Sequence, residues 1–204
     1  MSAVVPGPAA DPAATPPQTA RLVNLPNALT LLRLVVVPLF AVLLVSADGA
    51  DTEQRIWATV VFGLAIITDR YDGMIARRTN QVTEFGKLAD PIADKALTGA
   101  ALVVLSVLGE LPWWVTLPIL VREIGITVWR FVVLSKGRVV PASKGGKTKT
   151  VLQSVAIGLA LAPLPALLGS WMHGVNAAVM AAAFVVTIVT GVQYLIDDRR
   201  LNRG

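Results

Sequence analysis

The chain consists mainly of apolar stretches separated by short polar segments. Six stretches are long enough to be helices that cross a membrane, since about 20 apolar residues span a hydrocarbon core of roughly 30 Å. They cover residues 28–46, 56–71, 86–109, 112–135, 150–169 and 175–196. This pattern predicts an all-α integral membrane protein with six transmembrane helices. The second stretch is short and could continue past Asp72 on a protein-facing side.

The first residues of the chain follow a different pattern. Residues 1–20 are rich in Pro and Ala and contain no Lys or Arg. They therefore lack the positive segment and the compact apolar core of a secretory signal. We predict a disordered tail over residues 1–20 and a single six-helix membrane catalytic domain over residues 21–204.

Lys and Arg residues gather on one side of the predicted membrane. With six spans, both termini share a side with the second and fourth interhelical loops, and this side holds 13 of the 18 Lys and Arg residues. The other side holds only Arg55, and the remaining four lie within spans. Cytoplasmic loops are enriched in Lys and Arg. We therefore expect both termini, and the polar segment around residues 69–94, at the cytoplasmic face of the cell (inner or plasma) membrane.

Composition agrees with a membrane protein and narrows the chemistry. The chain is 54% hydrophobic and 15% charged, with a mean hydropathy of +0.66, whereas soluble domains are about 25% charged. The net charge of +5 does not indicate nucleic-acid binding, because the basic residues flank apolar runs. The chain has no Cys and a single His, His173. A bound metal would thus use oxygen ligands, which favours Mg²⁺, Mn²⁺ or Ca²⁺.

Four aspartates interrupt the apolar pattern between the second and third stretches. Asp69 and Asp72 are three residues apart and share one side of a helix end, while Asp90 and Asp94 are four apart and line one stripe of the third span. An antiparallel hairpin of these two spans would bring the four carboxylates together. A charged Asp inside a bilayer costs about 2.5–3.5 kcal/mol, and like charges repel. We therefore expect two divalent cations, Mg²⁺ or Mn²⁺, to hold the cluster.

Residues beside the aspartates suit a ligand that contains phosphate. Gly73 and Gly86 would let a ligand approach the backbone closely, and Arg77 could bind two phosphate oxygens at once. One alternative is a set of solvated loop aspartates, which is disfavoured because Asp90 and Asp94 lead into an apolar run. Another is the acidic cluster of a Mg²⁺ channel or transporter, which would not need Arg77 or the glycines.

The complete pattern is Asp69-x-x-Asp72-Gly73-x-x-Ala76-Arg77, eight residues, then Gly86-x-x-x-Asp90-x-x-x-Asp94. It resembles the signature of the CDP-alcohol phosphotransferase family at every defined position, although many members have Ser where this chain has Thr68. The resemblance extends from about residue 22 to the C-terminal end. It implies a six-span membrane enzyme, usually a homodimer, that transfers a phosphatidyl or similar group from a CDP-linked donor to an alcohol and releases CMP.

The same resemblance implies roles for individual residues. The four aspartates would bind the two metal ions, and Asp94 would also act as the general base. The residues implied in contacts with CDP are Asp69, Asp72, Gly73, Ala76, Arg77 and Gly86.

Basic residues in and beside the spans indicate what the acceptor alcohol carries. The set is Arg33, Arg122, Arg130, Lys147 and Lys149. Intramembrane Arg residues usually face a cavity or a partner, and five cations favour a phosphorylated acceptor over serine or free inositol. In the alternative interpretation, Arg122 is neutralised by the neighbouring Glu123 as a structural pair.

The stretches that carry these cations are similar to the bacterial phosphatidylglycerophosphate synthase branch of the family. They read N-x-P-N-x-L-T-x-x-R, R-E-I…R and G-K-x-K-T-x-x-Q. This branch joins CDP-diacylglycerol to sn-glycerol 3-phosphate. The acceptor-phosphate site implied by the resemblance comprises Thr30, Arg33, Arg122, Arg130, Lys147, Lys149 and Gln153. Enzymes of the same fold that use inositol phosphate, or phosphatidylglycerol as in cardiolipin synthase, remain alternatives, although the single charge of phosphatidylglycerol needs fewer cations.

Overall fold

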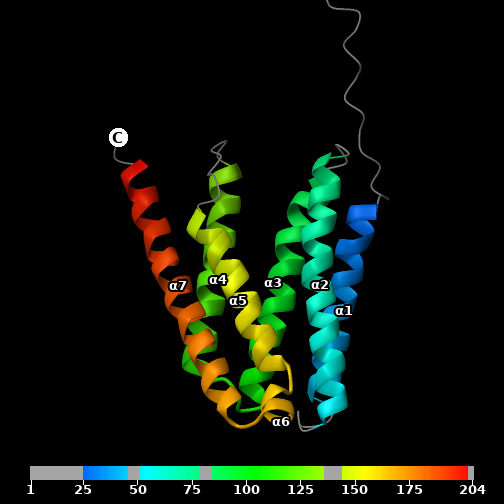
Figure 1. Ribbon diagram of the computed structural model, residues 1–204. Coiled ribbons are helices and arrows are strands. Elements are labelled where there is room, and N and C mark those ends of the chain that lie inside the picture. Colours follow the sequence, from blue (N-terminus) through cyan, green and yellow to red (C-terminus); the bar gives the residue numbers. More distant parts are fainter. Residues whose placement is uncertain (1–24, 46–50, 79–83, 136–143, 202–204) are drawn as a thin grey trace, which may run out of the picture.

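The computed structural model describes residues 25–45, 51–78, 84–135 and 144–201, and every regular element in these ranges is a helix. The helices are α1 (Leu25–Val45), α2 (Thr52–Arg78), α3 (Glu84–Val107), α4 (Trp113–Ser135), α5 (Lys144–Leu161), α6 (Leu164–Leu168) and α7 (Trp171–Leu201). The long helices run side by side, and the short α6 lies at one end of the bundle (Figure 1). The all-α prediction is confirmed for the described residues.

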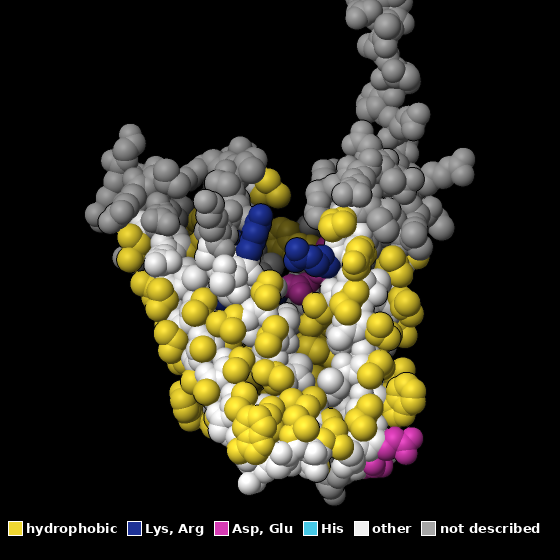
Figure 2. All heavy atoms as spheres, viewed as in Figure 1, with side chains coloured by type: hydrophobic (Ala, Val, Ile, Leu, Met, Phe, Trp, Pro, Cys, Tyr) yellow, Lys and Arg dark blue, Asp and Glu magenta, His cyan; other side chains and the backbone are white. Residues whose placement is uncertain are grey.

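Two of the described helices are long and apolar enough to cross a bilayer, judged by length and composition. They contain Ala28–Val45 in α1, with a mean hydropathy of 2.6, and Trp171–Ile196 in α7, with a mean hydropathy of 2.1. Large apolar side chains such as Val35, Val121 and Val185 are exposed on the outside of the bundle, where Figure 2 shows apolar side chains scattered over the visible face. The count of six spans and the cytoplasmic position of both termini stay predictions.

Helix α2 is longer than the predicted second span and includes the first pair of aspartates. It begins after Asp51, whose carboxylate accepts a hydrogen bond from the backbone N–H of Glu53 at 2.9 Å, as an N-cap residue does. It continues without interruption to Arg78. Asp69 and Asp72 therefore lie inside a continuous helix.

The predicted fifth span over residues 150–169 is wrong at both ends. Helix α5 begins at Lys144 and ends at Leu161, and α6 follows Pro163. Proline has no N–H to continue a helix, and its ring clashes with the preceding turn. Gly169 then ends α6 with a φ of 107°, which glycine adopts without a steric penalty. Lys147 and Lys149, which lie before the predicted span, are instead part of α5.

The expectation that the second and third spans pack directly on each other is wrong for most of their length. Helix α1 packs along both α2 and α3, whereas α2 and α3 contact each other only sparsely. Phe40 and Leu44 of α1 are buried in one core with Phe62 of α2 and Leu97 of α3. Packing follows the apolar area that can be buried, and α1 offers large side chains to both neighbours.

The remaining long helices form a second group. Helix α5 packs along α7 and also contacts α2 and α3, while α4 contacts α3 and α7. In Figure 1 the two groups lie close together near α6 and lean apart at the opposite end, where α1 begins and α7 ends. The aspartate-bearing end of α2 and the start of α3 lie at this open end.

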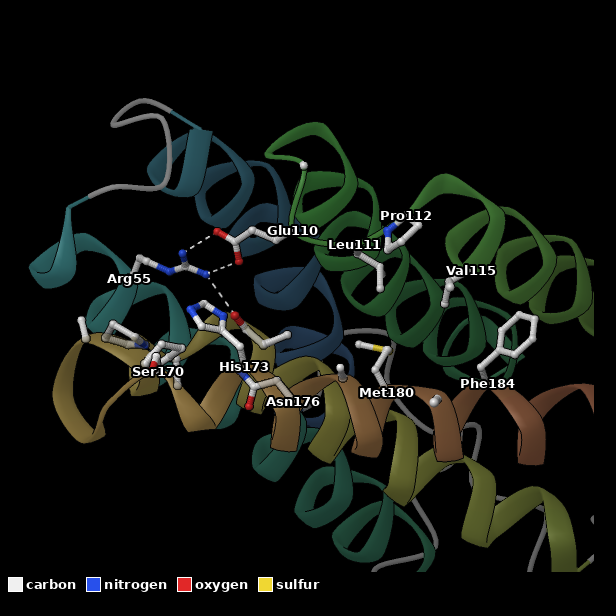
Figure 3. Close-up of a pocket in the computed structure, with 18 of the residues that line it drawn as sticks. Arg55, Glu110, Leu111, Pro112, Val115, Ser170, His173, Asn176, Met180 and Phe184 are labelled. Atoms are coloured by element: carbon white, nitrogen blue, oxygen red, sulfur yellow. Dashed lines mark hydrogen bonds and ion pairs between the residues drawn. The ribbon is translucent and has the colours of Figure 1, made fainter.

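Arg55 connects three parts of the chain at the α6 end (Figure 3). Its guanidinium donates to both carboxylate oxygens of Glu110, at 2.5 and 2.6 Å, and to the carbonyls of Ala160 and Leu161, at 3.0 and 3.2 Å. A cavity of about 1140 Å³ lies beside this contact, and its lining includes His173. None of the residues predicted for the site lines this cavity.

We expect Arg55→Ala to destabilise the protein without affecting the chemistry. Hydrogen bonds between charged groups contribute about 1.5–3 kcal/mol, and the variant also leaves two carbonyls without their donor. The midpoint of thermal unfolding in detergent should fall by several degrees. The control is Arg70→Ala, which removes an exposed arginine of the same helix. A midpoint equal to that of the control would show that Arg55 does not hold this end together.

Candidate active site

Helix α1 contacts one aspartate of each pair. Thr30 Oγ1 donates to Asp90 Oδ1 of α3 at 2.5 Å, and Arg33 Nη1 donates to Asp69 Oδ1 of α2, also at 2.5 Å. Both α1 side chains are buried. Because Thr30 and Arg33 are three residues apart, they project from one side of α1. Asp69 of α2 and Asp90 of α3 therefore both contact α1.

These contacts change how Thr30 and Arg33 are interpreted. Both were predicted to bind the acceptor phosphate, but in the structure they contact aspartates that were predicted to bind the metal ions. An arginine beside a carboxylate offsets its negative charge, and a threonine hydroxyl orients it. The two contacts support the aspartates, and the roles of Thr30 and Arg33 in binding the acceptor stay predictions.

The remaining signature residues are described only by their backbone. Asp72, Gly73, Ala76 and Arg77 lie in α2, and Gly86 lies in α3, but their side chains are outside the described part of the structure. Helical spacing places residues 69, 72, 73 and 76 on one side of α2, and residues 86, 90 and 94 along one stripe of α3. The contacts of these residues with CDP stay predictions.

A second cluster surrounds Glu123 of α4, whose side chain is 5% exposed. Its Oε1 pairs with Arg122 Nη1 at 3.0 Å and with the ammonium of Lys149 from α5. Its Oε2 pairs with Lys95 Nζ of α3 at 2.7 Å, and Lys95 also contacts Asp94 Oδ2 at 3.1 Å. The cluster thus contains two of the predicted acceptor-site cations and connects them to Asp94. It also supports the alternative in which Arg122 is paired with Glu123.

Helix α7 shapes the position of Arg122 from the other side. The guanidinium donates to Thr190 Oγ1 at 3.3 Å. A Cβ atom added to Gly191 would lie 3.0 Å from the Cγ atom of Arg122, so a larger residue would push this side chain away. Glycine at this position therefore lets α7 approach α4 closely enough to hold Arg122.

The other predicted acceptor residues are divided between the interior and the surface. Gln153 lies one helical turn after Lys149 on α5, is buried, and its Oε1 has no hydrogen-bond partner among the described residues. Arg130 and Lys147 are exposed and lie outside the Glu123 cluster. The structure therefore gathers Arg122, Lys149 and Gln153 but does not bring Arg130 and Lys147 to them.

The open end of the bundle is hollowed between the two groups of helices (Figure 2). Lys and Arg side chains lie on both sides of this hollow, and acidic side chains lie deeper, below the basic side chain on the side of α1 to α3. Among the described side chains, no three acidic or histidine residues converge closely enough to hold a metal ion. Since the side chain of Asp72 is not described, the site of four carboxylates stays a prediction.

Glu123 and Lys95 are the residues that the sequence analysis did not assign to the site. A carboxylate and an ammonium within apolar stretches are signals, because intramembrane charges are rare unless they are paired or functional. The pairing of Glu123 with Lys149 could not be deduced from sequence, since Lys149 is 26 positions away and lies on another helix.

Comparison with known proteins decides what kind of site this is. The sequence profile of the CDP-alcohol phosphatidyltransferase family matches residues 23–189. The chain belongs to the CDP-alcohol phosphatidyltransferase family. The match covers α1 to α6 and most of α7, and therefore all the residues that were predicted for the site. Proteins of this family are embedded in membranes, in agreement with the two apolar helices.

Individual members of the CDP-alcohol phosphatidyltransferase family resemble this chain over most of their length. A probable phosphatidylglycerophosphate synthase of Mycobacterium tuberculosis is 52% identical over 176 residues, which cover 86% of this chain and 82% of the relative. CDP-diacylglycerol–glycerol-3-phosphate 3-phosphatidyltransferases of Bacillus subtilis and Escherichia coli are 36% and 37% identical. These alignments cover 84% and 86% of this chain, and 93% and 95% of the respective relatives.

Proposed function

We propose that this protein transfers the phosphatidyl group of CDP-diacylglycerol to sn-glycerol 3-phosphate, which gives phosphatidylglycerophosphate and CMP for phospholipid synthesis. The observation that carries the proposal is the similarity over nearly the whole chain to relatives named for this reaction. The Glu123 cluster supports it, because Arg122 and Lys149 provide the charge that a phosphorylated acceptor needs and are linked to Asp94 through Glu123 and Lys95.

The aspartates suit a pair of divalent cations by their chemistry. Asp69, Asp72, Asp90 and Asp94 provide only carboxylate oxygens, which are the ligands that Mg²⁺ and Mn²⁺ prefer. We assign the binding of two such ions to these four residues, with Thr30 and Arg33 supporting Asp90 and Asp69 from α1. When bound, the ions would offset the charge of the diphosphate and stabilise CMP as the leaving group.

Two groups of residues hold the substrates in this proposal. Gly73, Ala76, Arg77 and Gly86 bind the CDP part of the donor, while Arg122 and Lys149 bind the phosphate of the acceptor. Asp94 accepts the proton of the acceptor hydroxyl. The hydroxyl oxygen attacks the phosphorus that carries the diacylglycerol, and the bond from this phosphorus to the CMP oxygen breaks on the opposite side. Lys95 contacts Asp94 and keeps its carboxylate near the acceptor cations.

The cellular arrangement belongs to the same proposal. We place the protein in the cell membrane as a multi-pass enzyme and a homodimer, with the open end of the bundle at the cytoplasmic face. The distribution of Lys and Arg supports this orientation. Soluble glycerol 3-phosphate would then reach the site from the cytoplasm, while the acyl chains of the donor stay in the lipid.

A panel of acceptors tests the proposed reaction. Purified full-length protein is given radiolabelled CDP-diacylglycerol and Mg²⁺ with glycerol 3-phosphate, inositol 1-phosphate, inositol, serine or phosphatidylglycerol, and CMP release is followed. We expect transfer only to glycerol 3-phosphate. Transfer to inositol 1-phosphate or phosphatidylglycerol instead would show that the proposed acceptor is wrong. Phosphatidyl transfer with release of CMP would still be the reaction. The absence of any transfer, together with metal flux in liposomes, would indicate a transporter.

A further inference from the structure

We propose that Glu123 is a positioning residue for the acceptor phosphate. Its carboxylate gathers Lys95, Arg122 and Lys149 from three helices and holds Arg122 and Lys149 where the phosphate binds. The inference rests on the proposed function, since it concerns the same acceptor. This role differs from a structural pair of Arg122 and Glu123. Here one carboxylate holds three cations in place, and one of them, Lys95, also contacts Asp94.

The geometry of the carboxylate supports this role. Oε1 receives both Arg122 and Lys149, and Oε2 receives Lys95 at 2.7 Å. Each oxygen is therefore occupied, and the cations come from α3, α4 and α5. Three positive groups around one point repel one another. Without a central anion, their long side chains would move apart toward water, as Lys and Arg side chains at membrane surfaces do.

Burial makes the central charge important. The side chain of Glu123 is 5% exposed and that of Lys149 is 2% exposed. Removing one partner of a buried ion pair leaves the other charge without compensation, which is strongly unfavourable. A neutral residue at position 123 would therefore favour arrangements in which Lys149 leaves the cluster.

The charge balance leaves the cluster attractive to an anion. The three cations of the cluster are opposed by Glu123 and Asp94, so one positive charge remains in excess among these residues. Glu123 thus aligns the cations without cancelling their attraction for phosphate. Because Arg122 and Lys149 are already held in position, they lose less side-chain conformational entropy when they bind phosphate.

Lys95 connects this arrangement to the reacting end of the acceptor. Its ammonium lies between Glu123 Oε2, at 2.7 Å, and Asp94 Oδ2, at 3.1 Å. The ammonium of Lys95 therefore connects Asp94, which accepts the proton, to Glu123, which holds the phosphate-binding cations. An acceptor whose phosphate is held by the cluster would have its hydroxyl directed toward Asp94.

The test compares Glu123→Gln with wild-type enzyme in detergent with Mg²⁺. Glutamine keeps the size of the side chain and removes the charge. We expect the KM for glycerol 3-phosphate to rise by at least about tenfold, and the KM for CDP-diacylglycerol to change by less than about twofold. Glu123→Asp keeps the charge and should recover part of the acceptor affinity.

The matched control is Glu110→Gln, which removes the partner of Arg55 at the α6 end of the bundle. This variant should lower thermal stability and leave both KM values unchanged.

Two results would overturn the role of Glu123. One is an unchanged KM for glycerol 3-phosphate in Glu123→Gln when Arg122→Ala raises it. The other is a lower thermal stability with fewer active molecules and unchanged KM values, which is the behaviour expected of a structural residue. If Glu123→Gln does not fold, Glu123→Asp decides, because its carboxylate is one methylene too short to hold all three cations in place: the acceptor KM should rise, and a wild-type value would contradict the proposal.

Failure of the proposed function is recognised separately. If the wild-type enzyme uses inositol phosphate instead of glycerol 3-phosphate, the proposed acceptor is wrong, and the same KM comparison with inositol phosphate still decides the role of Glu123. If the wild-type enzyme uses an acceptor without phosphate, both proposals are overturned.

Discussion

Asp94→Asn is expected to lower kcat by at least about a thousandfold, within the 10²–10⁴ range by which a positioned general base accelerates a reaction. Asparagine has nearly the same shape but cannot accept the proton of the acceptor hydroxyl. Lys95 also contacts Glu123, at 2.7 Å, and this contact does not involve residue 94, so we expect the surroundings of residue 94 to change little. The measurement is CMP release at saturating CDP-diacylglycerol and glycerol 3-phosphate.

Donor binding separates this loss from a general failure of the site. Calorimetric titration of CDP with Mg²⁺ should show affinity close to that of the wild type, because Asp69, Asp72 and Asp90 are unchanged and the amide oxygen introduced by Asp94→Asn is still an oxygen ligand for the second ion. Asp51→Asn is the matched control: it makes the same substitution at the start of α2, where Asn also caps a helix well. This control should retain full activity. Near-normal turnover in Asp94→Asn would show that Asp94 is not the general base.

Arg122→Ala is expected to raise the KM for glycerol 3-phosphate by about tenfold to a hundredfold. Hydrogen bonds to charged groups contribute about 1.5–3 kcal/mol, and each 1.4 kcal/mol corresponds to about a factor of ten in affinity. The KM for CDP-diacylglycerol should stay near the wild-type value, since no predicted donor contact involves α4. Steady-state kinetics with each substrate varied in turn provide the measurement.

A second arginine distinguishes binding from packing. Arg55→Ala also removes an arginine that is paired with a glutamate, but at the α6 end of the bundle. It should lower thermal stability without changing the acceptor KM. Equal acceptor KM values for Arg122→Ala and the wild type would show that Arg122 is a structural partner of Glu123, which is the alternative considered from the sequence.

The limits of prediction are visible in single residues. Asp69 and Asp90 were chosen from their spacing and from the family signature, neither of which predicted that both contact α1. Thr30 and Arg33 were also selected, but for the acceptor rather than for the aspartates that they contact. Pro163 explains why the C-terminal end of the fifth span was placed wrongly: the apolar composition continues through residue 169, although the helix does not. The average hydrophobicity of the stretch does not reveal the break, because proline is itself apolar. The helix nevertheless ends there, because proline cannot continue it.

The sequence by itself determined that this protein is a bundle of apolar helices with carboxylates at one end and a family signature in α2 and α3. These properties depend on run length and spacing along one segment, so they can be read locally. Only the tertiary structure decided that α1 lies against both α2 and α3, and that Glu123 collects cations from α3, α4 and α5. Such pairings depend on which side chains fill the space between helices distant in sequence, and no local pattern encodes that choice.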